Sequence, residues 1–512
     1  MKTISDPAAI EPYLTDESNA FKAPLMKVSE VLLPESVDDL ASILSSANSS
    51  RTPCTISGAG TGITGSRVPM QGGCVISLER SLTASVPRAW KAVPRNFPTG
   101  KTTIAISPDD RRARVPPGLT LDMLTEMLPD DLFYPPDPTE STAQLGGTVA
   151  TNASGSRTFY YGPTRDWVSG LTVVLADGDT LTIKRGEAFA DDDGILRFAT
   201  DSGQRYEVPI PTYSPPRTKN AAGLYASPRM DLIDLFVGCE GILGVFAEIE
   251  IKLAKRPAEL IADLAFFESE PNALAYADDI RALREKGIIA IEYFDASSLA
   301  FMRDKNPRIK QNHYAAVLVE ALGDRDDTVD AILEACERYK AVDDWSGPPE
   351  QFNEFRHSLP ESVNSYLKQR QSHKLATDFA VPASGFGEMM QSYRQADETF
   401  KKAFPRPGVH TVLFGHLGDF HLHFNFITHT EPEMAFCKQL YLPLARLAVA
   451  LGGTISAEHG VGKKTVGIAG REVPYLELMY GREGLEQIAA IKRALDPNLI
   501  LNIGNMLSDS FF

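Results

Sequence analysis

The chain has 512 residues, of which 43% are hydrophobic and 23% charged. This is ordinary globular composition, so a disordered, collagen-like or small disulfide-rich chain is excluded, and the length predicts about two or three domains. Fifty-one Lys and Arg residues against 67 Asp and Glu give a net charge of −16. No binding to nucleic acid is expected, because neutralising phosphates requires clustered Lys and Arg.

Up to residue 255 the sequence predicts short strands punctuated by glycine and proline, with amphipathic helices such as 36–47 between them. The strands are expected at CTIS near residue 54, GCVISL near 73, TTIAIS near 102, GLTVVLADG near 170 and LGVFAEIEIKL near 243. From residue 257, helical patterns at 271–286, 326–339 and 387–403 alternate with strands at IIAIEYFD, YAAVLVEAL, KLATDFAVP and HTVLFGHLGDFHLHFNF. This alternation is typical of an α+β fold.

The boundaries between these parts are predicted from proline-containing stretches. Residues near Arg256 and residues 346–350 are the expected domain joints. Residues 493–505, RALDPNLILNIGN, are expected to be a helix end followed by an extended segment.

A reducing compartment, the cytoplasm, is the expected location. The five cysteines are odd in number and scattered, without a Cys-x-x-Cys pair. Residues 1–20 carry acidic residues and prolines where a signal peptide needs an apolar run, and no stretch reaches the ~18 apolar residues of a membrane span. The most apolar window, 440–451, contains Pro443 and Arg446 and predicts a buried helix. Any contact with the inner membrane is therefore expected to be peripheral.

Residues 60–65, Gly-Thr-Gly-Ile-Thr-Gly, match the dinucleotide-binding pattern Gly-x-Gly-x-x-Gly, and Glu79 follows about twenty residues later. That fingerprint requires a helix that crosses back to the sheet, which takes ~10–12 residues or more. Only residues 66–73, SRVPMQGG, are available, so the Rossmann interpretation is excluded. A glycine-rich loop whose N–H groups can approach an anion remains, with a mobile turn as the alternative.

Two further segments are rich in small residues. Residues 141–156 have small side chains at nearly every position, and residues 236–246, FVGCEGILGVF, place three glycines before a strand. Small residues let a backbone wrap a large flat ligand, and glycine next to a strand often marks the close approach of one. Three such segments in one domain favour a ligand site.

Together these motifs resemble the FAD-linked oxidases of the vanillyl-alcohol-oxidase (PCMH) type, in the branch of D-lactate dehydrogenase, the glycolate oxidase flavin subunit and D-2-hydroxyglutarate dehydrogenase. The segments that carry the resemblance are PCTISGAGTGITGSRVP, PPDPTESTAQLGGTVATNASG, YGPTRDWVSGLTVVLADG, TKNAAGL, FVGCEGILGV, GHLGDFHLHF, AEHGVGKK and DPNLILNIG. The resemblance implies a two-part FAD-binding domain over 1–255, an α+β cap domain that binds substrate over 256–470, and a C-terminal segment, 471–512, that packs back on the FAD domain.

The same resemblance implies where FAD binds, with its pyrophosphate on residues 57–64. The expected contacts are Ser57, Gly58, Ala59, Gly60, Thr61, Gly62, Ile63, Thr64, Pro136, Asp137, Ser141, Gly146, Gly147, Thr151, Asn152, Ser154, Gly155, Gly241, Ile242 and Asn502. Ser57 stands where relatives usually carry an arginine. No histidine or cysteine occupies a familiar attachment position in these segments, so FAD is expected to be bound non-covalently.

Six of the nine histidines lie between His410 and His459. If residues 420–426 are extended, after an interruption at Gly418 and Asp419, His421 and His423 point to one face. Two imidazoles plus the carboxylate of Glu458 would suit Zn, Mn or Fe(II), whereas a single histidine is more often a hydrogen-bonded packing residue. The zinc-protease motif is excluded, because no histidine follows Glu458-His459 four residues later.

The resemblance assigns the metal to His416, His423 and Glu458 and leaves His459 as the catalytic base; zinc is the expected ion, with Mn or Fe as alternatives. His421 stands where relatives have asparagine. It is either an extra metal or substrate contact or, the favoured interpretation, an asparagine substitute that hydrogen-bonds beneath the site. Asp419 is expected in a turn rather than as a ligand.

Substrate recognition is predicted from two positions. By resemblance, the planar guanidinium group of Arg356 would bind both oxygens of the substrate carboxylate. The alternative is that Arg356 is a solvent-exposed arginine on a helix. Relatives that take dicarboxylates often have a lysine two residues before the equivalent of Asp378. Here that position is Ala376, and Lys374 lies two residues further back. This favours D-lactate or an acid with an apolar tail over D-2-hydroxyglutarate.

The expected function is an FAD-dependent, metal-assisted dehydrogenase of a D-2-hydroxy acid. Hydride would pass from C2 to flavin N5, the hydroxyl proton to His459, and the electrons to a quinone, a cytochrome or an electron-transfer flavoprotein. The alternatives are a flavin subunit of a glycolate-oxidase-type complex and a non-redox transferase similar to alkylglycerone-phosphate synthase. The oligomeric state, with a homodimer as one option, stays open.

Overall fold

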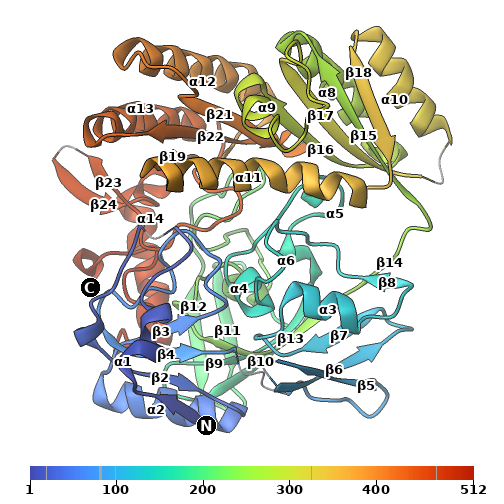
Figure 1. The fold of residues 1–512 in the computed structure, drawn as a ribbon. Coiled ribbons are helices and arrows are strands. Elements are labelled where there is room, and N and C mark those ends of the chain that lie inside the picture. The colour runs from blue at the N-terminus through green and yellow to red at the C-terminus, as the bar shows by residue number, and fades with distance from the viewer. Residues whose placement is uncertain (19, 80–82, 99, 324–325, 469) are drawn as a thin grey trace.

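The computed structural model describes residues 1–512 except 19, 80–82, 99, 324–325 and 469. A four-stranded and a six-stranded sheet lie in the N-terminal half, in the lower part of Figure 1, and a larger sheet built from residues 260–428 lies above them. Helices accompany sheets with mainly antiparallel strand pairs in both parts, which confirms the predicted α+β class. None of the helices in the described part of the chain is both long and apolar enough to cross a membrane.

The first sheet has the strand order β1-β2-β4-β3, with β1 (Lys2–Ile4), β2 (Val28–Leu33), β3 (Cys54–Ser57) and β4 (Gly73–Ser77). Strands β3 and β4 pair in parallel, and residues 58–72 between them contain no helix, which confirms the exclusion of a Rossmann unit. The elements before them are α1 (Pro7–Ile10), η1 (Glu11–Tyr13), η2 (Leu25–Lys27) and α2 (Val37–Ser50). Leu40 and Leu44 of α2 pack with Ile76 and Val174, so this helix joins the first sheet to the second.

The second sheet is antiparallel, with the order β10-β9-β13-β7-β6-β5. Its strands are β5 (Lys91–Phe97), β6 (Gly100–Ser107), β7 (Arg112–Val115), β9 (Val168–Val174), β10 (Thr180–Lys184) and β13 (Val245–Lys252). Around it lie α3 (Leu121–Met127), α4 (Leu145–Ala150), α5 (Thr158–Tyr161), α6 (Thr164–Trp167), α7 (Leu232–Phe236), the hairpin β11 (Ile195–Ala199)–β12 (Arg205–Pro209) and the pair β8 (Leu132–Phe133)–β14 (Ala254–Lys255).

The third sheet has the order β18-β15-β17-β16-β21-β22-β19, with β20 beside β22. Its strands are β15 (Leu260–Phe267), β16 (Ile288–Asp295), β17 (Ala315–Leu322), β18 (Asp343–Gly347), β19 (His373–Ala376), β20 (Phe379–Ala380), β21 (Thr411–His416) and β22 (His421–Thr428). Its helices are α8 (Glu270–Ala282), η3 (Arg284–Lys286), α9 (Ala296–Met302), α10 (Asp326–Arg338), α11 (Glu350–Arg370), α12 (Ala383–Ala403), η4 (Leu417–Asp419) and α13 (Glu431–Ala450).

Two expectations for this region were wrong. Residues 346–350 are no domain joint, because β18 pairs with β15 and leads directly into α11 inside the same unit. The predicted single strand KLATDFAVP is divided into β19 and β20. The interruption falls at Asp378, whose carboxylate turns toward residues 456–459 and accepts their hydrogen bonds.

The C-terminal elements are β23 (Thr465–Ile468), β24 (Arg471–Pro474), α14 (Glu477–Leu495) and η5 (Asp509–Phe511). The tail returns to the first sheet, where Cys54 N donates to Ile500 O (2.7 Å) and Asn502 Oδ1 accepts from Ile56 N (2.7 Å). The expectation of an extended tail was wrong, because Asp496 accepts hydrogen bonds from the N–H groups of Ile500 and Leu501 and curls the chain.

A buried ion pair between Lys492 and Asp496 holds this tail, with side chains 4% and 0% exposed. Lys492→Ala leaves the Asp496 carboxylate unpaired and is expected to lower the free energy of unfolding by roughly 3–5 kcal/mol. The matched control is Arg482→Ala, which breaks an exposed pair with Glu486 and should cost less than about 1 kcal/mol. Urea unfolding of both variants checks this, and equal midpoints would contradict it.

Candidate active site

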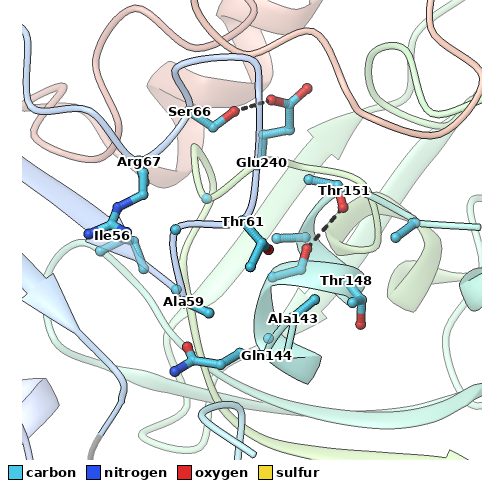
Figure 2. Close-up of a pocket in the computed structure, with 18 of the residues that line it drawn as sticks. Ile56, Ala59, Thr61, Ser66, Arg67, Ala143, Gln144, Thr148, Thr151 and Glu240 are labelled. Carbon is cyan, nitrogen blue, oxygen red and sulfur yellow. Dashed lines mark hydrogen bonds between the residues drawn. The ribbon is translucent and has the colours of Figure 1, made fainter. Parts of the chain in front are cut away.

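A cavity of about 310 Å³ lies between the loop after β3, helix α4 and the start of β13. Figure 2 shows Ser66 hydrogen-bonded to Glu240 on one side of it, and Gln144, Thr148 and Thr151 on another. The predicted FAD contacts that line the cavity are Ser57, Gly58, Ala59, Gly60, Thr61, Gly62, Ile63, Thr64, Gly146, Gly147, Thr151, Ser154, Gly241 and Asn502.

Seven glycines expose backbone in the wall of this cavity. A Cβ added at Gly62 or Gly147 would meet no heavy atom within 4 Å, so both glycines face open space. Gly60 has a φ of 92°, a conformation that favours glycine. Exposed backbone N–H groups suit the pyrophosphate of a dinucleotide, so the residues present fit FAD. The individual FAD contacts remain predictions.

The other predicted contacts do not line the cavity. They are Pro136, Asp137, Ser141, Asn152, Gly155 and Ile242. Some of them support residues nearby, since Asn152 Oδ1 accepts from Arg165 N (2.9 Å) and Asp137 Oδ1 accepts from Arg157 N (3.1 Å). An added Cβ at Gly155 would lie 2.0 Å from Asp137 O, so glycine is needed there for packing.

Two buried charged residues at the site were missed by sequence reasoning. Glu240 accepts from the N–H groups of Val461 (2.8 Å) and Gly462 (2.7 Å) and thereby ties the loop of residues 456–463 to the FAD-binding part. Lys219 Nζ donates to Glu458 Oε2 (3.1 Å) and to Gly155 O (2.9 Å). The only available signal was that both lie in motifs of the family, FVGCEGILGV and TKNAAGL.

The three predicted metal ligands meet beside this cavity, which Glu458 itself lines. Glu458 Oε2 lies 3.2 Å from His416 Nε2, and Glu458 Oε1 lies 3.3 Å from His423 Nε2. His421 belongs to the same cluster, and the four potential ligand atoms all lie within 4.8 Å of one another. We call His416, His421, His423 and Glu458 the His/Glu cluster. Imidazole nitrogens with one carboxylate are a donor set that fits a divalent transition metal.

Each of the two predicted histidine ligands is oriented through its other nitrogen. His416 Nδ1 lies 2.6 Å from Glu292 Oε1 on β16, and His423 Nδ1 lies 3.3 Å from the carbonyl oxygen of Thr377. When Nδ1–H donates to these acceptors, the lone pair on Nε2 faces the cluster. Metal-binding histidines in proteins usually have this arrangement.

Buried charges control the pKa values at the cluster. Burial would raise the pKa of Glu292, but His416 and Arg356 lower it to about 2. Burial lowers the pKa of His416, yet Glu292 and Glu458 raise it overall to about 9. Burial likewise opposes ionisation of Glu458, but Lys219 and His416 hold its pKa well below the usual range. The carboxylates are therefore ionised, which a cation requires.

The predicted base, His459, lies at the edge of the cluster and lines the cavity. Its Nδ1 is 3.0 Å from Asp378 Oδ2, and its Nε2 is 3.4 Å from Glu458 Oε1. Burial lowers the pKa of His459, but Asp378 raises it above the usual value. Asp378 also accepts from Ser456 Oγ (2.7 Å). A carboxylate that holds one imidazole nitrogen leaves the other free to accept a proton.

Arg356 on α11 lies behind the cluster. Its Nη2 donates to Ser156 Oγ (3.1 Å) and is 3.6 Å from Glu292, while its Nη1 is 3.6 Å from Glu320. The side chain is only 18% exposed, so it is not a solvated helix arginine. Its role toward a substrate carboxylate stays a prediction.

Comparison with known proteins agrees with this architecture. Residues 257–506 match the family model of FAD linked oxidases, C-terminal domain, and residues 99–184 match that of an FAD binding domain. The chain is 30% identical to the glycolate oxidase subunit GlcD of Bacillus subtilis (strain 168), covering 93% of this chain and 88% of that one. It is 24% identical to a D-lactate dehydrogenase of Anaerostipes hadrus, over 92% and 88%.

The fold is also similar to a solved structure of alkyldihydroxyacetonephosphate synthase, with a TM-score of 0.66 and 16% identity, over 98% of this chain and 82% of that one. At this identity the likeness concerns the fold alone. On the family models and the sequence relatives, the chain belongs to the FAD-linked oxidases, in the branch of glycolate oxidase subunit GlcD, D-2-hydroxyglutarate dehydrogenase and D-lactate dehydrogenase.

Proposed function

We propose that this FAD-linked oxidoreductase is a metal-assisted dehydrogenase that oxidises a small D-2-hydroxy acid, such as D-lactate, to the 2-oxo acid. The observation that carries the proposal is the convergence of His416, His423 and Glu458 beside the cavity that fits FAD. Such a cluster suits a substrate with neighbouring hydroxyl and carboxylate oxygens. Non-covalent FAD and zinc are the expected cofactors, with Mn or Fe as alternatives.

Bound FAD would supply an acceptor for the C2 hydrogen and its electron pair, and a divalent ion would supply a Lewis acid for the hydroxyl oxygen. His416 and His423 would hold the ion through Nε2, together with Glu458. His459 is placed to accept the hydroxyl proton on Nε2, because its other ring nitrogen, Nδ1, faces the Asp378 carboxylate. Asp378 then stabilises the imidazolium that forms. Removing the proton and the C2 hydrogen with its electron pair leaves the 2-oxo acid.

The proposal of a small acid as the substrate is supported by the names of the relatives and by two residues of strand β19. Relatives are named glycolate oxidase subunit and D-lactate dehydrogenase. Ala376 stands where dicarboxylate-specific relatives often have lysine, and Lys374 Nζ instead lies 3.4 Å from Asn364 Oδ1. The electron acceptor would be a quinone, a cytochrome or an electron-transfer flavoprotein. One relative is named a subunit, so a partner chain is part of the proposal.

Steady-state assays with an artificial electron acceptor test the proposal. Purified protein with full FAD and metal content should oxidise D-lactate or a related D-acid and leave the L-enantiomer unchanged. Turnover by the isolated chain would argue against a subunit that acts only within a complex. A transferase would oxidise no acid and would need no stoichiometric metal. Failure with every acid of the panel would contradict the proposal.

Arg356→Ala is expected to lower kcat/KM, mainly through KM, by about ten- to a hundredfold. The reason is that a charged hydrogen bond to the substrate carboxylate contributes roughly 1.5–3 kcal/mol. Arg356→Lys should recover part of the lost kcat/KM, because lysine keeps the positive charge but lacks the two-pronged guanidinium group. Metal content must be measured alongside, since Arg356 also contacts Glu292, which orients His416. Unchanged KM with normal metal content would contradict the assignment.

A further inference from the structure

We propose that His421 is a fourth protein ligand of the same metal ion, which is then held by three imidazoles and one carboxylate. The inference rests on the metal site of the proposed function and deepens it. It replaces the interpretation favoured from the sequence, in which His421 only substitutes for an asparagine beneath the site.

The hairpin of β21 and β22 places His421 beside His416. His421 begins β22, and its Cα pairs with that of His416 at the end of β21, so the hairpin places the two rings side by side. Their ring centroids lie 5.3 Å apart, and the centroids of His421 and His423 lie 4.6 Å apart. The tight turn that permits this includes Phe420, which has a positive φ of 53°. Period-two alternation along β22 then puts His421 and His423 on the same face.

One ring nitrogen of His421 is unpaired among the described residues. His421 is fully buried, and its Nε2 lies 2.8 Å from Asp378 Oδ1. Asp378 is a carboxylate that already accepts several N–H and O–H groups, so Nε2 of His421 carries the proton and Nδ1 carries the lone pair. Among the described residues, Nδ1 has no hydrogen-bond partner. A buried polar atom left unpaired costs about 1–3 kcal/mol, and a metal ion at the cluster would remove this cost.

The unpaired nitrogen of His421 lies on the side of Glu458. His421 Nδ1 lies 3.8 Å from Glu458 Oε2, the carboxylate that the Nε2 atoms of His416 and His423 also approach. All three histidines thus follow one scheme, with one nitrogen against an oxygen acceptor and the other toward Glu458. This scheme is the usual support of metal-binding imidazoles. An asparagine amide could also donate to Asp378, but it would bring no second nitrogen to the cluster.

A fourth ligand has a consequence for the ion. Three nitrogens and one carboxylate oxygen fill the four positions of a tetrahedral zinc site. Such a site leaves no position open for a substrate. A hydroxy acid can then bind only to an ion that accepts five or six ligands. Zinc, the expected ion, would need an expanded shell to bind the substrate as well, and the extra imidazole should tighten binding at least about tenfold.

X-ray absorption of the zinc-loaded protein, combined with metal competition against a chelator, tests the proposal without using activity. The spectrum should show three imidazoles in the wild type and two in His421→Asn, whose metal affinity should fall at least about tenfold. His410→Asn is the matched control, because His410 is buried and its Nε2 lies 2.8 Å from Phe404 O, outside the His/Glu cluster. Its affinity should equal that of the wild type.

Two imidazoles in the metal-loaded wild type, or equal affinities in wild type and His421→Asn, would overturn the role of His421 and leave the proposed function intact. If His421→Asn fails to fold and bind FAD, the wild-type imidazole count alone decides. A wild-type protein that binds FAD but no metal overturns both this inference and the metal-assisted reaction.

Discussion

Glu458→Gln protein is expected to remain yellow with FAD and to lose both its metal ion and its dehydrogenase activity. Glu458 contributes the one carboxylate of the His/Glu cluster, and glutamine keeps its size but not its charge. Loss of the ion removes several kcal/mol of stabilisation of the developing alkoxide. At about 4 kcal/mol, kcat would fall by roughly 10³-fold. Flavin absorbance, metal content and turnover, measured on the same preparation, check that FAD is retained and that the metal and the activity are lost.

A matched control for this variant is Glu472→Gln, an exposed glutamate in the β23–β24 hairpin near the same loop. It should behave as the wild type in all three measurements. Glu458→Gln protein with full metal content and undiminished turnover would contradict the assignment of Glu458 as a ligand.

His459→Gln is expected to keep both FAD and metal while kcat falls by about 10²–10⁴-fold. The variant lacks the group that accepts the hydroxyl proton, and general base catalysis typically contributes that much. Because His459 lies outside the ligand set assigned to the ion, the loss should appear in kcat and in the rate of anaerobic flavin reduction rather than in metal content.

His357→Gln serves as the control for His459→Gln, since His357 is an exposed histidine on α11. Its rate of flavin reduction should match that of the wild type. If His459→Gln also reduced its flavin at the wild-type rate, His459 would be excluded as the base and Asp378 would have only a structural role.

Much of the fold, and the meeting of His416, His423 and Glu458 in one cluster, could be predicted from the sequence. Alternation along β22 placed His423 on one face, the absence of a helix after the glycine loop excluded a Rossmann unit, and the family motifs added Glu458. Local patterns carry this information because they depend on residues close together in the chain.

The remaining features depend on contacts between distant segments. Lys219 and Glu240 are buried charges whose partners, Glu458 and the N–H groups of Val461 and Gly462, lie more than two hundred residues away in the sequence. The break between β19 and β20 arises because Asp378 accepts hydrogen bonds from residues 456–459. No propensity or periodicity could indicate these partners.

Anaerobic reduction of the bound flavin by a panel of D- and L-2-hydroxy acids tests the central claim most directly, when it is followed before chelation, after chelation and after metal is restored. The account predicts that a small D-acid bleaches the oxidised flavin, that a chelator abolishes this without releasing FAD, and that a divalent metal restores it. Protein with full FAD and metal whose flavin stays oxidised with every acid, or is reduced equally fast after the metal is removed, would contradict it.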